Sequence, residues 1–175
     1  MEKLVRIIKQ VALALLFGGP ATTTFIAVSQ VKAGQAQGLT AAEAAFANAP
    51  LFILAGKAAL AAAFILLIAE AIDFAVVKKP TKLMLARYGA SILCIVATIV
   101  FAVGIVPPME ELLPKIKTDE AAHAEFKKLH EISRAAFGLT ILFALMSISL
   151  SALGDKTEAE QVKSLAQAKQ ALGSE

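Results

Sequence analysis

The chain has 175 residues, of which 58% are hydrophobic and 18% are charged, and it carries a net charge of +3. A soluble domain of this length is usually about half apolar and about a quarter charged, so this composition argues against a soluble protein and for a membrane protein. The positive charge is small and spread along the chain, which indicates no nucleic-acid partner.

Four stretches are long and apolar enough for a helix to cross a bilayer, which takes about 20 residues. They are Val11–Ser29, Leu51–Ala71, Tyr88–Val106 and Ala135–Leu153. Backbone groups exposed to lipid find no water partners, so helices are the expected spanning form. The sequence therefore predicts an all-α protein, with a four-helix transmembrane bundle over residues 1–154 that lies in a lipid bilayer.

The first stretch begins like a signal peptide. Basic residues precede a short apolar core, and "VKAGQ" follows as a candidate cleavage site. We expect this segment to be retained rather than cleaved, and to form the first spanning helix. Pro20, in "GGPATTT", is expected to kink that helix.

The second stretch is rich in alanine, and Ala55, Ala59 and Ala63 stand four residues apart. Small residues at this spacing share one helix face and let another helix approach closely. We therefore expect this face to pack at the centre of the bundle or against the helix of a partner subunit.

The helix that contains the second stretch carries the acidic residues Glu70 and Asp73 near its inner end, and carboxylates are costly to place in a spanning helix. They are three residues apart, so they share a face of the helix. Their expected partners are Arg87 and Lys9, because both lie at the same end of the neighbouring helices. The pattern predicts buried ion pairs at this end of the bundle.

Lys57 lies in the second stretch too, but near its other end. Two interpretations are open. The ammonium group extends along the helix to the membrane surface, or it pairs with Glu110, Glu111 or Glu131.

The third stretch runs into "VPPMEELLP", where three prolines are expected to end the helix. The fourth helix is expected to run from Asp119 to Leu153, about 52 Å at 1.5 Å per residue. This exceeds an apolar bilayer core of about 30 Å, so the start of the helix should project from the membrane. We expect a break at Gly154, followed by a cytoplasmic amphipathic tail over residues 155–175.

The start of the fourth helix, "EFKKLHEISRAAFG", combines charged and aromatic residues. Phe126, His130 and Arg134 recur every four residues and so share a face, beside Ser133. Three interpretations are open. The face is a structural latch, it contacts an anionic lipid head group or a partner protein, or His130 is an axial ligand of haem or a chlorophyll-type pigment.

No metal site is expected, because the chain has two histidines and one cysteine. His123 and His130 are seven residues apart, whereas two helical metal ligands are usually four apart.

The run "FKKLHEIS" resembles the F-x-x-L-H-x-x-S segment that opens the last helix of the transmembrane protein 205-like family, with matches at Phe126, Leu129, His130 and Ser133. "VPPMEEL" is similar to that family's exit from helix three, and "FGGPATTTFIA" loosely resembles its first helix. The resemblance implies a four-helix membrane protein with no agreed enzymatic activity.

Lysine and arginine are more frequent on one side of the predicted bundle, and the cytoplasmic side of membrane proteins usually carries this excess. The richer side holds Lys3, Arg6, Lys9, Lys78, Lys79, Lys82, Arg87, Lys156, Lys163 and Lys169. The other side holds Lys32, Lys115, Lys117, Lys127 and Lys128. We therefore expect both termini in the cytoplasm or its organellar equivalent.

No nucleophile–base pair, phosphate-binding loop or carboxylate dyad is evident in the sequence, so we expect no enzyme. The first hypothesis is an accessory or scaffold subunit of a larger membrane complex, with other membrane subunits as partners. A small transporter or permeation protein is the alternative that Pro20, Lys57 and Glu70 favour. A haem- or pigment-associated subunit using His130 is the third.

Overall fold

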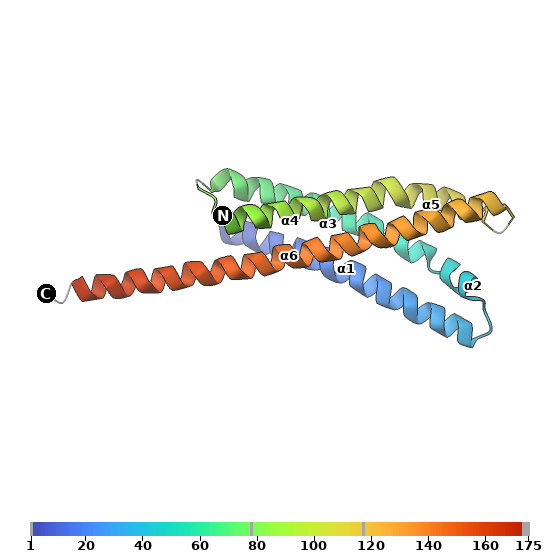
Figure 1. Ribbon diagram of the computed structural model, residues 1–175, viewed down its shortest axis with the longest axis horizontal. Coiled ribbons are helices and arrows are strands. Elements are labelled where there is room, and N and C mark those ends of the chain that lie inside the picture. Colours follow the sequence, from blue (N-terminus) through green and yellow to red (C-terminus); the bar gives the residue numbers. More distant parts are fainter. Residues whose placement is uncertain (1, 78, 117, 173–175) are drawn as a thin grey trace.

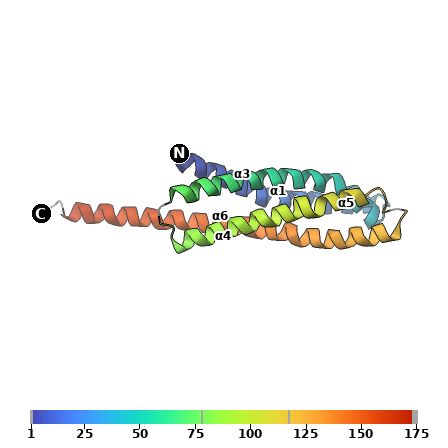
Figure 2. The ribbon, with the colours of Figure 1, turned by 90° about the horizontal axis from the view of Figure 1, so that it is seen from above.

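The computed structural model describes residues 2–77, 79–116 and 118–172, with side chains for all of these except residues 2, 41, 42, 45 and 155–172. Its elements are α1 (Glu2–Ala36), α2 (Ala41–Phe46), α3 (Ala49–Val76), α4 (Lys82–Ile99), the π-helix η1 (Val100–Ile105), α5 (Val106–Leu112) and α6 (Glu120–Leu172). Figures 1 and 2 show a bundle of long helices, which confirms the all-α prediction.

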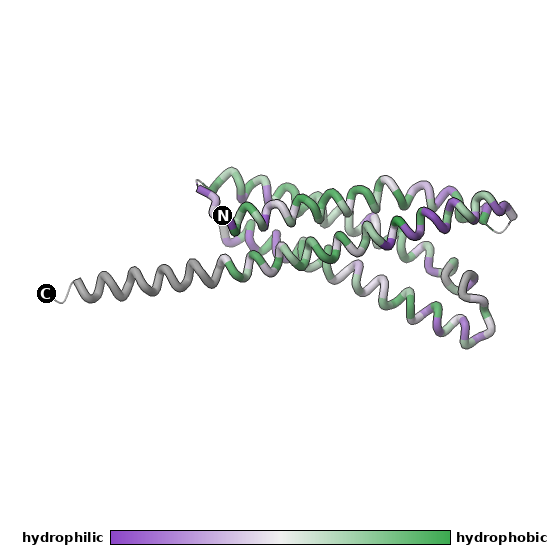
Figure 3. Tube along the Cα trace, in the orientation of Figure 1, coloured by the Kyte–Doolittle hydropathy of each residue, from purple (hydrophilic) through white to green (hydrophobic). Residues whose placement is uncertain are grey.

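Within the residues that the structure describes, four helical segments are long and apolar enough to cross a membrane. They are Lys3–Ala36, Ala49–Val76, Lys82–Leu112 and Glu120–Gly154. Figure 3 shows that apolar residues dominate their middle parts, with hydrophilic residues toward the ends. Large side chains such as Phe25 and Phe64 point outward, 74% and 63% exposed, and a surface this apolar is suited to lipid. The chain is therefore an integral multi-pass membrane protein.

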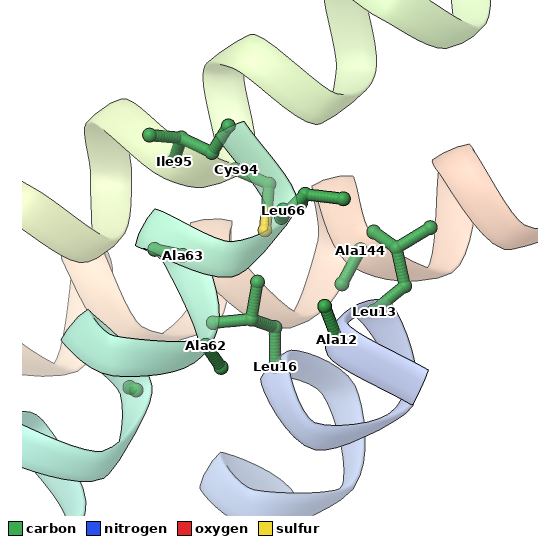
Figure 4. Packing of buried hydrophobic residues seen from close by; sticks show 10 residues of the cluster. Ala12, Leu13, Leu16, Ala62, Ala63, Leu66, Cys94, Ile95 and Ala144 are labelled. Carbon is green, nitrogen blue, oxygen red and sulfur yellow. The ribbon is translucent and has the colours of Figure 1, made fainter. Parts of the chain in front are cut away.

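The core of the bundle is a layer of tightly packed side chains in which all four long helices take part (Figure 4). Leu13 and Leu16 of α1 meet Leu66 of α3, with Cys94 of α4 and Ala144 of α6 beside them. All five are at most 1% exposed. We call these five residues the central layer.

Away from the central layer the bundle opens. Figure 1 shows α1 crossing α6 and then diverging from it toward the end that carries α2. At this end η1, α5 and α6 pack around Phe101 and Phe137, while the last turns of α1 pack on α2.

Glycine ends α1. Gly38 has a φ of +90°, a conformation that side chains other than that of glycine rarely adopt. The Leu39 amide donates to the Gly34 carbonyl and the Gly38 amide to that of Gln35, the arrangement of a Schellman helix cap. The cap lets the chain reverse into α2, whose start is capped by Thr40 and Glu43.

Contrary to the sequence prediction, the third spanning helix continues through the first two of its three prolines, and it ends just before the third, Pro114. It passes through η1 and continues as α5, with Pro107 and Pro108 in the first turn. Prolines are tolerated there because the first amides of a helix need no helical partner. The wider turn of the π-helix, closed by the Val106 amide on the Phe101 carbonyl, relieves the clash of a proline ring with the preceding turn.

The predicted break at Gly154 is also wrong. Helix α6 runs without interruption from Glu120 to Leu172, about 80 Å at 1.5 Å per residue. One glycine inside a helix costs only about 1 kcal/mol relative to alanine, too little to end it. The amphipathic character predicted for residues 155–175 lies outside the side chains that the structure describes.

Candidate functional site: an ion-pair cluster and an open cleft

Four charged residues meet at the end of the bundle where α1 begins. Lys9 of α1 lies 2.8 Å from Asp73 and 3.6 Å from Glu70, both on α3. Arg87 of α4 lies 3.4 Å from Glu70 and also pairs with Asp73. We call these four residues the ion-pair cluster. The structure thus brings together the four partners that the sequence placed at one level.

Hydroxyl groups complete the coordination of the two carboxylates. The Tyr88 hydroxyl donates to Asp73 over 3.0 Å, and the Ser91 hydroxyl donates to Glu70 over 2.7 Å. Ser91 also lies 2.8 Å from the Ser147 hydroxyl of α6. The cluster and its hydroxyl partners therefore join α1, α3, α4 and α6 in one polar network.

The cluster is deeply placed but balanced in charge. The side chains of Lys9 and Glu70 are each 4% exposed, and two cations face two carboxylates. A buried charge is tolerated when it is paired and hydrogen-bonded, and each member here has at least one opposite charge within 4 Å. This arrangement suits a structural lock between helices.

A cavity of about 390 Å³ borders the cluster near the start of α1 and the end of α3, and Lys9, Asp73 and Arg87 line it. On the opposite side the central layer closes the bundle with apolar side chains. The cluster is thus accessible from one end, and the packed layer separates it from the other half of the molecule.

A seam of small and hydroxyl-bearing residues joins α4 to α6, and the sequence analysis did not identify it. Ser91 meets Ser147, the Cys94 thiol donates to the Thr140 carbonyl over 3.5 Å, and the hydroxyls of Thr98 and Thr140 are 3.4 Å apart. The sequence signal was the recurrence of small or polar residues every three or four positions on both helices, typical of close helix packing in membranes.

The alanine face of α3 packs inside this chain. Ala59 and Ala63 are buried in the central core beside α1, while Ala55 is half-buried. Gly56, on the same side, faces Phe101 and Val106 so closely that an added Cβ would lie 3.4 and 3.3 Å from them. The face therefore serves the bundle interior.

Lys57 lies apart from the cluster and is exposed. None of the predicted partners Glu110, Glu111 and Glu131 pairs with it, and the structure gives it no ion pair among the described residues. Of the two interpretations left open by the sequence, the described residues therefore do not support pairing within the chain, because α3 turns this side chain away from the bundle.

Where α1 and α6 diverge, a cavity of about 550 Å³ lies between them. We call it the α1–α6 cleft. It is lined by Thr24, Ala27, Val28, Val31, Lys32, Gln35, Asn48, Phe52, Phe101, His130, Ser133, Arg134, Phe137, Gly138 and Ile141. A second cavity of about 290 Å³ adjoins it, with Phe126 and His123 in its lining. His130 and Ser133 line both.

The four residues predicted at the start of the fourth helix thus all border these two cavities. The Phe126 and His130 rings lie parallel, with centroids 6.4 Å apart. The Ser133 hydroxyl donates to the His130 carbonyl over 2.7 Å. Arg134 is exposed toward the cleft. Within the described part of the chain, no group of three or more metal-ligating side chains occurs.

Comparison of the chain with protein-family models, with curated proteins and with solved structures found no match in any of the three. The fold and the two sites therefore define the class directly: a multi-pass, all-α membrane protein with a four-helix bundle, locked by ion pairs at one end and open at the other.

Proposed function

We propose that this membrane protein is a non-catalytic accessory or scaffold subunit of a larger membrane complex. The observation that supports it is the outward position of Lys57 without an ionic partner in the described part of the chain. The four other residues predicted to form ion pairs are paired with one another inside the chain, while Lys57 faces outward with no ion pair among the residues described. A charge on the lipid-facing side of a spanning helix is costly, and an acidic residue on another subunit would offset that cost.

The surroundings of Lys57 fit a helix–helix contact. Leu54, Ala61 and Phe64 are exposed on the same side of α3, three, four and seven residues away. We call these four residues the Lys57 stripe. Ala61 is small, so a partner helix can approach closely one turn further along α3, and its acidic side chain can reach the ammonium group.

The transporter alternative has less support in this geometry. A transport path for a polar substrate would need polar groups along the bundle axis, whereas the central layer of Leu13, Leu16, Leu66, Cys94 and Ala144 is apolar and closely packed. Transport would require these helices to separate.

The pigment alternative rests on His130, which borders both cavities. Kinship with the transmembrane protein 205-like family remains a proposal, based on the F-x-x-L-H-x-x-S segment at Phe126, Leu129, His130 and Ser133.

Purification in mild detergent through a C-terminal tag, followed by native mass determination, tests the subunit proposal. We expect the wild type in a defined complex with other membrane proteins. Lys57→Leu should lower the amount of co-purified partner by about tenfold, the effect of losing one polar contact between membrane helices, and Lys57→Arg should retain it. Lys128→Leu, which removes an exposed lysine outside the stripe, is the control.

A lone wild-type chain in mild detergent would contradict the proposal. So would a complex that keeps its composition in Lys57→Leu. An absorption spectrum of the same sample tests the pigment alternative: we expect no visible band, and a Soret-type or chlorophyll-type band that disappears in His130→Ala would support it.

A further inference from the structure

The lining of the α1–α6 cleft is mostly apolar and includes two basic residues. Helices α1 and α6 run in opposite directions, and the end of α1 lies at the same end of the molecule as the start of α6, where the two helices have diverged (Figure 1). Its apolar lining includes Val28 of α1 and Phe137 and Ile141 of α6. Its basic lining includes Lys32 of α1 and Arg134 of α6, with His130 one turn away from Arg134.

The charged lining of the cleft is of one sign. Lys32 and Arg134 are both exposed, and neither has an ion pair among the described residues. No aspartate or glutamate is among the residues that line the cleft. Two unneutralised cations in an otherwise mostly apolar lining match a ligand with an anionic head and an apolar tail.

The size of the cleft decides between a lipid and a protein occupant. An α-helix with side chains is about 10–12 Å wide and fills roughly 400–600 Å³ per turn. A cavity of about 550 Å³ therefore holds only about one turn of a partner helix. An acyl chain is thinner and can extend along the recess, and the volume lies within the usual range of small-ligand sites, about 300–1,000 Å³.

From these observations we propose that the α1–α6 cleft binds one anionic phospholipid of the surrounding bilayer. An acyl chain lies between Val28, Phe137 and Ile141, and the phosphate interacts with Lys32 and Arg134. This site is separate from the Lys57 stripe, so the lipid proposal does not depend on the proposed subunit function, and either can fail without the other.

Native mass spectrometry of bound lipid tests the proposal. The full-length protein is reconstituted in nanodiscs of phosphatidylcholine with one-fifth phosphatidylglycerol and is released in mild detergent. We expect the wild type to retain one phosphatidylglycerol in preference to phosphatidylcholine. Retention should fall by roughly fivefold for each charge removed in Lys32→Gln and Arg134→Gln, whereas Lys115→Gln and Lys128→Gln, at the same end of the molecule, should leave it unchanged.

A second variant tests the apolar part of the cleft separately. Gly138 lines the cleft, and a Cβ added there meets no atom within 4 Å, so Gly138→Leu should place its side chain in the recess without disturbing the helix. We expect it to abolish phosphatidylglycerol retention. Gly89→Leu is the matched control, because Gly89 has the same free space but lies on α4, away from the cleft.

Equal retention of the two lipids by the wild type would overturn the proposal. It would also be overturned if retention were the same in the wild type, Gly138→Leu and the double variant Lys32→Gln/Arg134→Gln. The same is true if the wild type retained no lipid and the double variant instead lost a protein partner, since the cleft would then be a protein interface.

Discussion

Glu70 is the more deeply buried of the two carboxylates in the ion-pair cluster. Its side chain is 4% exposed and it accepts from Arg87 and Ser91 while lying 3.6 Å from Lys9. Removal of this carboxylate would leave two cations with Asp73 alone, and an uncompensated buried charge is far more costly than an exposed one.

We therefore expect Glu70→Ala to lower the free energy of unfolding by about 3–5 kcal/mol, the usual cost of breaking a buried ion pair. Denaturant titration in detergent micelles, followed by circular dichroism, measures the change. Glu131→Ala, on the exposed side of α6, should change stability by less than about 0.5 kcal/mol. A loss below about 1 kcal/mol for Glu70→Ala would mean that water in the adjoining cavity already screens the cluster.

At this scale the sequence predicted the charged partners but not their hydroxyl partners. Glu70 and Asp73 share a helix face, and Lys9 and Arg87 lie at the same depth. The spacing and level of the charged residues were therefore enough to predict that they pair. Tyr88 and Ser91 follow from how α4 is rotated about its axis. Rotation depends on packing among all four helices, which one sequence does not specify.

At the scale of the element, the interface between α4 and α6 holds the molecule together by close approach. Ser91, Cys94 and Thr98 line α4, with Thr140 and Ser147 on α6. Between these two α6 residues lies Ala144, whose exposure is 0%. Its small side chain lets the two helices approach each other closely.

We expect Ala144→Leu to lower the free energy of unfolding by about 1–3 kcal/mol, because added methylene groups in a packed core force neighbouring side chains apart. Ala135→Leu, at an exposed position of the same helix, makes the identical chemical change without that crowding and should be close to neutral. Thermal unfolding of the two variants in the same detergent separates the outcomes. A similar melting temperature for both would show that α6 can move away from α4 at little cost.

The sequence predicted the existence and order of the spanning helices, since long apolar stretches identify them directly. It placed their ends less well. Gly154 and Pro107 are residues that commonly end helices, yet α6 and the third spanning helix continue through them. A glycine inside a helix costs only about 1 kcal/mol relative to alanine. This cost is outweighed by tertiary packing and by a lipid environment that favours unbroken backbone hydrogen bonds.

At the scale of the whole molecule, an even number of spanning helices predicts that the two termini lie on the same side of the membrane. The excess of lysine and arginine on the side that holds both termini predicts that this side is cytoplasmic. The ion-pair cluster lies near that side, while the α1–α6 cleft lies in the opposite half.

Fusions to a fluorescent reporter that folds only in the cytoplasm test this orientation. We expect fluorescence from fusions after Glu175 and after Pro80, and at least about tenfold less from a fusion after Gly38, because the positive-inside preference sets the orientation of short loops. Expression level, measured by an epitope tag, is the control for each fusion. A bright Gly38 fusion with a dark Glu175 fusion would invert the orientation.

The ion-pair cluster also bears on how the chain is made. Asp73 lies 64 residues after Lys9, and synthesis proceeds at about 5–20 residues per second, so Lys9 emerges roughly 3–13 s before its acidic partner. During that interval α1 must reside in or near the membrane with an ammonium group that its own chain cannot yet neutralise. The position of Lys9 close to the start of α1 makes this delay tolerable, because the side chain can reach the aqueous surface until α3 arrives.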